Sequence, residues 1–199
     1  MPARVVFHLV TLVAVCILQP FVVHATDRSR SATSEKIAEP STYRMTDFRA
    51  PTPSTITGGR VIGDKDAMLL WKAKQAIFID VLPRAERPKK LPKRILWRTK
   101  KRFNIPGSIW LVDVGYGKLS KERAAYFERN LTRMTAGDRA RTLVFYCLRQ
   151  CWMSWNAAKR AIALGYTNVI WYPNGTDGWT SIGGPLARSK PVPMSATTN

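Results

Sequence analysis

The sequence predicts an α/β fold with a mainly parallel central sheet and helices on both faces. Short apolar runs of the kind that form buried strands alternate with stretches of helical periodicity, which favours parallel strands joined by crossover helices. The runs at 76–81 and 143–146 are apolar throughout except for Asp80, as is typical of central strands covered on both faces. With 199 residues, the chain is long enough for one domain with a substantial core.

The predicted domain begins at residue 60. Residues 60–63 are expected to form a short strand, and Asp64 is expected to cap a helix that runs to about Lys74. The strand at 76–81 comes next and places Asp80 near its carboxyl end.

A strongly basic stretch, here called the basic excursion, follows this strand at residues 84–102. Ten of its nineteen residues are Lys or Arg and one, Glu86, is acidic. Pro88 and Pro92 exclude a regular helix, so we expect an exposed segment that the apolar residues 95–97 pack in place. It is interpreted either as a solvated surface or as a rim that draws an anionic substrate or partner toward the cysteine loop.

The later elements are predicted from apolar periodicity, caps and glycine breaks. In chain order they are a strand at 108–112, a helix from Ser120 to about Met134, a strand at 143–146, a helix from 153 that ends at Gly165, a strand at 168–172 and a turn at 174–179.

Four regions make up the predicted domain organisation. Residues 1–25 are expected to be a secretory signal peptide, because a basic residue precedes an apolar core and a small-residue cleavage pattern. A retained membrane anchor is the alternative, which Pro20 and the short apolar core disfavour, so we expect no stable membrane insertion after cleavage. Residues 26–59 are interpreted as an irregular N-terminal extension, 60–180 as the folded domain and 181–199 as a flexible C-terminal tail.

Charge and residue inventory restrict the chemistry. The formal net charge is +19, and export argues against nucleic acid and for an anionic partner, a small anionic substrate or a membrane surface. Without residues 1–25 the chain keeps two cysteines and no histidine. One chain then builds neither a Cys–His nucleophilic pair nor a closed zinc site, so we expect no metal and no cofactor.

Both of these cysteines lie in one predicted loop. Residues 147–151 join the strand at 143–146 to the following helix and carry Cys147 and Cys151. In an open α/β sheet, ligands bind outside the carboxyl ends of strands, where backbone N–H groups and the helix dipole favour an anion. The sequence therefore predicts that Cys147 has a lowered pKa and is a thiolate near neutral pH.

The order of these motifs resembles the rhodanese domain over residues 60–179. The resemblance rests on FIDV at 78–81, IPGSI at 105–109, VFYC at 144–147 with the following loop and helix, LGYTNV at 164–169 and GTDGW at 175–179. Within that superfamily, residues 147–155 and the signal peptide resemble the exported PQQ-dependent catabolism-associated CXXCW motif proteins. Three residues separate the cysteines here, whereas the name of that group implies two.

The resemblance implies a rhodanese-like fold, a periplasmic location and a role beside quinoprotein alcohol dehydrogenases. It also implies Cys147 as the catalytic residue, with a persulfide held by the loop amides. The position of Cys151 inside the loop departs from the family pattern, and we expect it as the second catalytic residue. Active rhodaneses often have an arginine where this chain has Trp152 and Leu82, and Arg149 and the basic excursion are candidates to compensate. The expected substrate-binding residues are Leu148, Arg149, Gln150, Trp152, Met153 and Asp80.

Three functions remain open at this stage. In the first, Cys147 transfers sulfane sulfur to a thiol or cyanide, and Cys151 is a bystander or a resolving thiol. In the second, Cys147 attacks a disulfide and Cys151 resolves it, since the short loop allows the Cα separation of about 4.4–6.8 Å that a disulfide needs. In the third, the protein binds or assembles a quinoprotein partner, and a structural Cys147–Cys151 disulfide holds the loop. The nearby tryptophans are interpreted either as core or as an apolar wall for a ligand: Trp152, Trp155, Trp171 and Trp179.

Overall fold

The structure is a computed structural model that describes Met1 and residues 37–194. The predicted signal peptide beyond Met1, the first part of the predicted extension up to residue 36, and residues 195–199 of the predicted tail lie outside the described residues. Within the described part of the chain, no helix combines the length and the apolar character needed to cross a lipid bilayer.

Five parallel strands form the central sheet in the order β1-β6-β5-β2-β4. Asp80 pairs with Tyr146, and Tyr146 pairs with Tyr172, so the carboxyl ends of the three central strands lie side by side. The predicted mainly parallel sheet is confirmed. The strands are β1 (Arg60–Val61), β2 (Ile77–Asp80), β4 (Ile109–Trp110), β5 (Leu143–Tyr146) and β6 (Val169–Tyr172).

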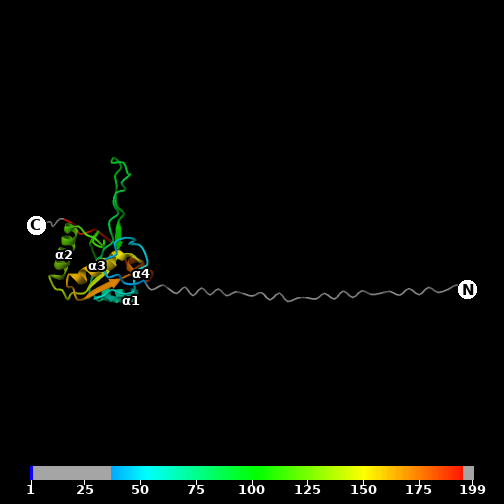
Figure 1. Cartoon of the computed structure of the whole chain (residues 1–199), viewed down its shortest axis with the longest axis horizontal. Coiled ribbons are helices and arrows are strands. Elements are labelled where there is room, and N and C mark those ends of the chain that lie inside the picture. The colour runs from blue at the N-terminus through cyan, green and yellow to red at the C-terminus, as the bar shows by residue number, and fades with distance from the viewer. Residues whose placement is uncertain (2–36, 195–199) are drawn as a thin grey trace. The chain divides into compact units, whose positions relative to one another are not determined.

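Helices cover both faces of this sheet, as predicted (Figure 1). Alternate strand residues point to opposite faces. Phe145 and Trp171 pack with the helices α2 (Lys121–Thr135) and α3 (Trp152–Ala163). The neighbouring residues Tyr146 and Tyr172 pack on the other face with α1 (Asp64–Lys72) and α4 (Gly175–Ser181).

The caps of the helices match the predictions in two of three cases. The Ser120 hydroxyl accepts a hydrogen bond from the Arg123 amide at 3.2 Å and caps α2. Gly165 follows α3 with φ of 86°, a conformation that suits glycine. The expected cap at Asp64 is wrong, because Gly63 is the N-cap of α1. The Asp64 carboxylate instead accepts hydrogen bonds from Tyr172 and Asn174, at 2.8 and 2.9 Å.

The C-terminal third contains more regular structure than its sequence suggested. The segment predicted as a turn at 174–179 is most of helix α4. The expectation of a flexible tail at 181–199 is wrong for the described residues, because β7 (Ala187–Ser189) pairs antiparallel with β3 (Arg102–Asn104). The Val192 amide then donates to the Trp110 carbonyl at 2.9 Å, which extends the contact with the domain.

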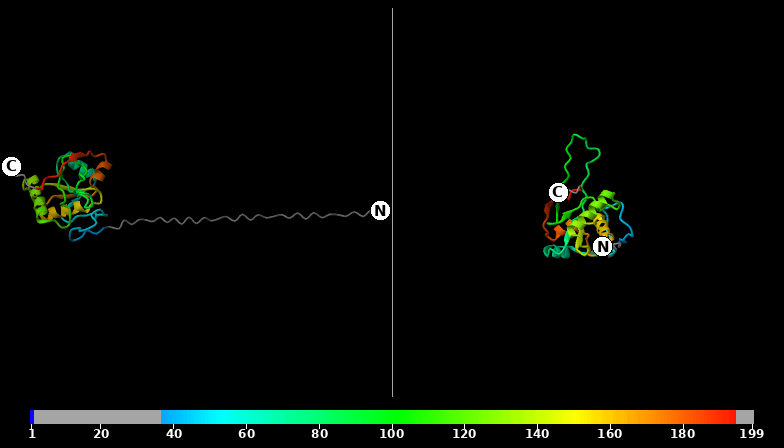
Figure 2. Two further views of the ribbon diagram at one scale, coloured as in Figure 1. Left: turned by 90° about the horizontal axis from the view of Figure 1, so that it is seen from above. Right: turned by 90° about the vertical axis from the view of Figure 1, so that its left-hand side faces the viewer.

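The basic excursion projects away from the body of the domain between β2 and β3 (Figure 1, Figure 2). It contains no helix, as the prolines predicted. The expected packing by residues 95–97 is wrong, because Ile95 and Leu96 are 44% and 74% exposed and belong to neither core cluster.

Residues 37–59, here called the N-terminal segment, contain no helix or named strand but pack against the domain. Ile56 is buried in the core beside α3. The side chain of Asn156 in α3 accepts from the Arg44 amide and donates to the Arg44 carbonyl, both at 2.9 Å. The segment is therefore part of the folded domain.

Candidate functional site

The cysteine loop, residues 147–151, lies where the sequence placed it, between β5 and α3. Cys147 follows the last residue of β5 at the carboxyl edge of the sheet, and Cys151 is the N-cap residue of α3. Both cysteines carry free thiols in this structure.

The start of α4 supports the loop from the side. The Thr176 amide donates to the Cys147 carbonyl at 3.1 Å, and the Arg149 amide donates to the Asp177 carboxylate at 2.9 Å. Gly175 has φ of 50°, and a Cβ atom at this position would overlap the Cys147 carbonyl group. These contacts with α4 therefore hold the backbone of the loop in place, and one of them bonds the Arg149 amide to the Asp177 carboxylate.

The predicted low pKa of Cys147 is wrong. Its side chain is fully buried. Burial, the hydrogen bond and charge of Cys151, and the charge of Asp80 together raise the pKa of the Cys147 thiol well above its ordinary value. The amide of Leu148 acts in the opposite direction but does not reverse the shift. Cys147 is therefore the protonated member of the pair near neutral pH.

Cys151 has the lowered pKa instead, at about 6. The hydrogen bond from Cys147 lowers the pKa most, and the amides of Met153 and Leu148 and the charge of Arg49 contribute, while burial opposes them. Cys151 makes no well-aligned side-chain capping bond, yet its place at the start of α3 still favours a negative sulfur. The loop therefore holds one thiolate, on Cys151, that is stabilised by the neighbouring thiol.

The N-terminal segment covers this loop. Arg49 forms an antiparallel bridge with Cys151, and the Trp152 amide donates to the Phe48 carbonyl at 2.9 Å. The Trp152 indole donates to the Pro51 carbonyl at 3.1 Å. Since Cys147 is 0% and Cys151 2% exposed, the thiols are closed off from solvent by protein atoms.

Asp80 lies close to the cysteines but is bound to Arg102. The Arg102 guanidinium donates to the Asp80 carboxylate at 2.7 Å, and the Leu82 amide donates to it at 3.0 Å. Asp80 is fully buried, which raises its pKa, and the ion pair limits that rise. In addition to burial, the charge of Asp80 therefore raises the pKa of Cys147. Its carboxylate is buried and already hydrogen-bonded, so it is not available to bind a ligand.

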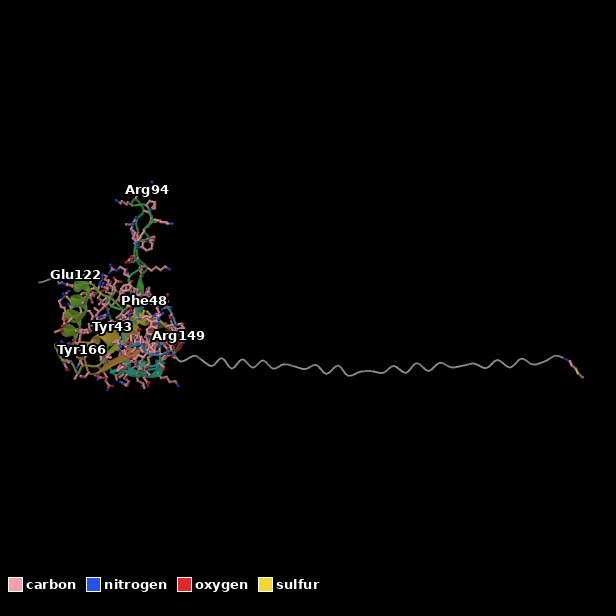
Figure 3. All side chains as sticks on the ribbon, in the orientation of Figure 1. Tyr43, Phe48, Arg94, Glu122, Arg149 and Tyr166 are labelled. Carbon is pink, nitrogen blue, oxygen red and sulfur yellow. The ribbon has the colours of Figure 1, made fainter. Side chains whose placement is uncertain are left out.

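The other predicted substrate-binding residues are divided between surface and core. Arg149 and Gln150 are exposed, with Arg149 at the surface of the domain in Figure 3, and Leu148 is half-buried. Trp152 and Met153 are buried. The structure favours the core interpretation of the tryptophans, since Trp152, Trp155, Trp171 and Trp179 are all almost fully buried.

Sequence reasoning missed three charged residues at the site: Arg49, Arg102 and Asp177. Arg102 was counted within the basic excursion without a partner, although the position of Asp80 at the carboxyl end of a buried strand was a signal that a cation was needed. Arg49 and Asp177 reach the loop through long-range contacts that no local pattern indicates.

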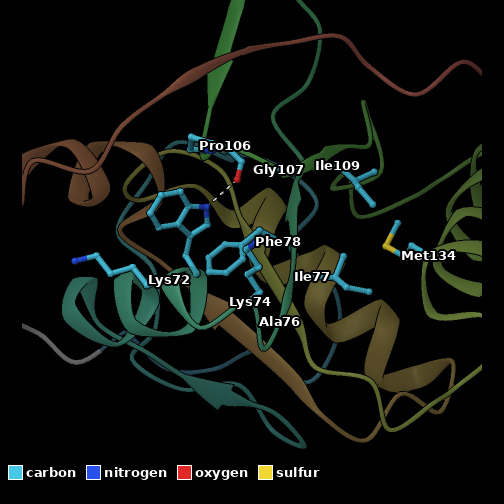
Figure 4. Close-up of a pocket in the computed structure, with 10 residues that line it drawn as sticks. Lys72, Lys74, Ala76, Ile77, Phe78, Pro106, Gly107, Ile109 and Met134 are labelled. Atoms are coloured by element: carbon cyan, nitrogen blue, oxygen red, sulfur yellow. Dashed lines mark hydrogen bonds between the residues drawn. The ribbon is translucent and has the colours of Figure 1, made fainter.

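One large cavity lies away from the cysteines. It has a volume of about 800 Å³ and lies at the beginning of β2, the strand end opposite Asp80 (Figure 4). Trp71 lines it and donates to the Pro106 carbonyl at 2.8 Å. The cavity therefore does not form the substrate site for the thiols.

The assignment of the thiolate predicts the pH dependence of alkylation. The rate at which iodoacetamide modifies Cys151 should rise through pH 6, because the thiolate is the reactive form and its pKa is about 6. Cys147→Ala should move this midpoint upward toward the ordinary value of about 8.5, since it removes the main stabilising hydrogen bond. Trypsin cleaves after Arg149, so mass spectrometry reads the two cysteines on separate peptides. An unchanged midpoint in the variant would contradict the assignment.

A loop with paired thiols at the carboxyl edge of five parallel strands defines an α/β domain with a cysteine-based site. The family model described as "Rhodanese-like domain" matches residues 65–182, more than half of the chain. The chain belongs to the rhodanese-like domain family, which confirms the predicted rhodanese-like fold. No curated protein sequence matches the chain significantly.

Several solved structures are similar to the chain at low sequence identity. A thiosulfate sulfurtransferase from Pseudomonas aeruginosa is 18% identical, over 67% of this chain and 21% of that chain, with a TM-score of 0.43. A Bacillus halodurans protein is 18% identical, over 64% and 76%, with a TM-score of 0.43. An uncharacterized protein from Saccharomyces cerevisiae is 20% identical, over 62% and 92%, with a TM-score of 0.38.

Proposed function

We propose that this protein handles sulfur through a reactive cysteine pair, with Cys151 as the nucleophile and Cys147 as the resolving thiol. The family supports a sulfurtransferase type of activity. The position of the two thiols carries the assignment of roles: Cys151 is the N-cap residue of α3, where the helix N-terminus favours a negative sulfur and lowers its pKa, whereas full burial raises the pKa of Cys147. These roles are the reverse of those that the sequence suggested.

The first step is attack of the Cys151 thiolate on the sulfane sulfur of an anionic donor such as thiosulfate. A new S–S bond forms on Cys151, the S–S bond of the donor breaks, and sulfite leaves with the electron pair. The charges of Arg49 and Arg149, both exposed beside the loop, favour the approach of an anion.

The second step uses Cys147. Its thiol attacks the inner sulfur on Cys151, a Cys147–Cys151 disulfide forms, the persulfide S–S bond breaks, and the sulfane sulfur leaves with the proton of Cys147 as hydrosulfide. The two cysteines are oxidised by two electrons and the sulfane sulfur is reduced by two. With a protein or small-molecule disulfide as substrate, the same pair performs thiol–disulfide exchange, in which Cys151 attacks and Cys147 resolves.

Access to the pair requires the N-terminal segment to move. The bridge between Arg49 and Cys151 and the bond between Trp152 and Phe48 separate the thiols from solvent. At the loop this cover consists of the half-buried residues Phe48 and Ala50 and of hydrogen bonds from Trp152 to the Phe48 and Pro51 carbonyls, so opening it is a local rearrangement and not unfolding of the domain.

The same burial favours a second candidate function, a binding or assembly protein without catalysis. In that case a Cys147–Cys151 disulfide or the closed dithiol holds the loop in shape, and the surface of the domain contacts a partner. For both candidate functions we also propose what the resemblance to the CXXCW motif proteins implies. The protein is a member of that group and is exported to the periplasm by a signal peptide at 1–25. Its partner there is a quinoprotein dehydrogenase of PQQ-dependent alcohol catabolism.

Cysteine variants assayed with thiosulfate test the proposal. Cys151→Ser should abolish persulfide formation, measured as a mass increase, and also cyanide-dependent and thiol-dependent turnover. Cys147→Ser should still accept one sulfur on Cys151 but should not release sulfide without an added thiol. The mass of the protein isolated from the periplasm of an expressing bacterium also shows whether residues 1–25 are removed.

In protein that keeps residues 1–25, Cys16→Ser is the matched control, because it removes the third cysteine of the chain and should leave both reactions unchanged. Persulfide formation that survives in Cys151→Ser but is lost in Cys147→Ser would reverse the proposed roles. An unsubstituted protein that accepts no sulfur and exchanges no disulfide would support the binding function.

A further inference from the structure

The basic excursion is held at its root and extends into solvent, with Arg94 near its tip (Figure 3). Among the described residues, the hydrogen bonds of 85–101 stay within this stretch. The Arg87 guanidinium donates to the Pro92 carbonyl at 2.6 Å, and the Ile95 amide donates to the same carbonyl at 2.9 Å. At the root, Arg102 is bound to Asp80. The tip, residues 87–98, is therefore locally ordered and exposes most of its side chains, with Leu91 and Trp97 half-buried.

The tip combines exposed apolar side chains with a high density of cations. Ile95 and Leu96 are 44% and 74% exposed, and Trp97 is half-buried. Basic residues flank them on both sides in the sequence, and the excursion has ten Lys or Arg residues against one acid. A protruding group of this kind leaves its apolar surface in water unless another surface covers it.

We propose that the tip of the basic excursion docks on an anionic phospholipid surface. In this arrangement Ile95, Leu96 and Trp97 enter the headgroup region, and the flanking Lys and Arg side chains bind lipid phosphates. Aliphatic residues and tryptophan with surrounding cations are the composition of segments that lie in the membrane interface. Anionic lipid attracts juxtaposed lysine and arginine through its surface potential.

Two observations favour a lipid surface over a small anion or an acidic protein. The apolar residues belong to the segment that projects from the domain (Figure 1), and none of them lines the cavities found at β2, at the root of the excursion or beside α2. Lys and Arg residues precede and follow the apolar residues in the sequence. This arrangement suits a surface whose negative charge surrounds the point of apolar contact, such as an anionic bilayer. The proposal is independent of the cysteine chemistry and of residues 1–25.

Vesicle binding of the full chain tests the proposal. The protein should co-sediment with vesicles of phosphatidylglycerol and phosphatidylcholine, at least about tenfold more weakly with phosphatidylcholine alone, and less at high salt. The double variant Ile95→Ser/Leu96→Ser should bind about tenfold more weakly, because it removes the aliphatic contact. Lys93→Gln/Arg94→Gln should lower affinity about 25-fold, since each cation contributes roughly a fivefold factor.

A charge-matched control separates docking by the tip from general attraction. Lys65→Gln/Lys72→Gln in α1 removes the same charge from an exposed helix and should bind nearly as well as the unsubstituted protein. Lipids brominated on the acyl chains should quench Trp97, and Trp97→Phe should remove that quenching, since residues 1–36 contain no tryptophan.

Two results would overturn the proposal. The first is an absence of binding to the anionic vesicles, which would leave an acidic protein as the partner of the excursion. The second is that Lys93→Gln/Arg94→Gln and Lys65→Gln/Lys72→Gln weaken vesicle binding equally while Ile95→Ser/Leu96→Ser has no effect. That result would show only non-specific electrostatic attraction. Unchanged thermal unfolding of each variant confirms that the fold is intact, as expected for exposed residues.

Discussion

Asp80→Ala will lower the free energy of unfolding by about 3–5 kcal/mol. The carboxylate is fully buried and is 2.7 Å from the Arg102 guanidinium, whose side chain is 10% exposed. Removing the acid leaves a buried cation without compensation, which costs far more than the ion pair itself contributes. In the described structure, one terminal nitrogen of Arg102 is already buried without a hydrogen-bond partner, so no second acceptor is available to replace Asp80.

Urea denaturation measures this loss, and two variants serve as controls. Asp66→Ala removes an exposed acid from the first turn of α1 and should change stability by about 0.5 kcal/mol. Asp80→Leu/Arg102→Met removes both charges and should be much more stable than Asp80→Ala, because no unpaired charge remains buried. If the double variant were as unstable as the single one, packing and not charge would explain the loss.

Trp155→Ala will cost about 3–5 kcal/mol, because a fully buried indole is replaced by a cavity. Trp155 packs edge-to-face with Trp152 at 5.5 Å between ring centroids, and Lys159 lies 4.8 Å from its ring centre. Its indole N–H also donates to the Thr55 carbonyl at 3.1 Å. The substitution therefore weakens both the core beside α3 and the attachment of the N-terminal segment.

Denaturation midpoints and proteolysis separate these two effects. Trp155→Phe keeps an aromatic side chain and loses the hydrogen bond, so its loss of stability should be the smaller one. Trp97→Ala is the matched control, since this tryptophan lies on the basic excursion outside both core clusters and should change stability by less than about 0.5 kcal/mol. Faster trypsin cleavage within residues 37–59 in both Trp155 variants would show that the indole bond holds the segment. If Trp155→Ala lowered the stability less than Trp97→Ala, the proposed contribution of Trp155 to core packing would be contradicted.

The elements that the sequence predicted well are those whose patterns are local. The central strands β2, β5 and β6 are continuous apolar runs, and their burial on both faces is the reason for that composition. Helix α4 was missed because Gly175 and Gly178 disfavour a helix, and packing of Trp179 in the core overrides that preference. Strand β7 was missed because its three residues have no strand pattern and depend on pairing with β3.

The site was located correctly but its roles were not. The sequence places both thiols in one loop, and the strand-to-helix transition fixes that position. The sequence contains no signal that tells which of the two sulfurs points into the core and which faces the helix amides. This orientation determines the pKa of each thiol. The contribution of Arg49 was also invisible, because its contact with Cys151 spans about half of the chain.

The attachment of the N-terminal segment to α3 changes what counts as the unit of folding. The family match begins at residue 65, after β1 and after every residue that bonds to Asn156, Trp152 and Trp155 from the N-terminal side. A fragment cut at the family limits would present these side chains to water and lack an edge strand of the sheet. The evolutionary boundary and the thermodynamic boundary of this domain therefore do not coincide.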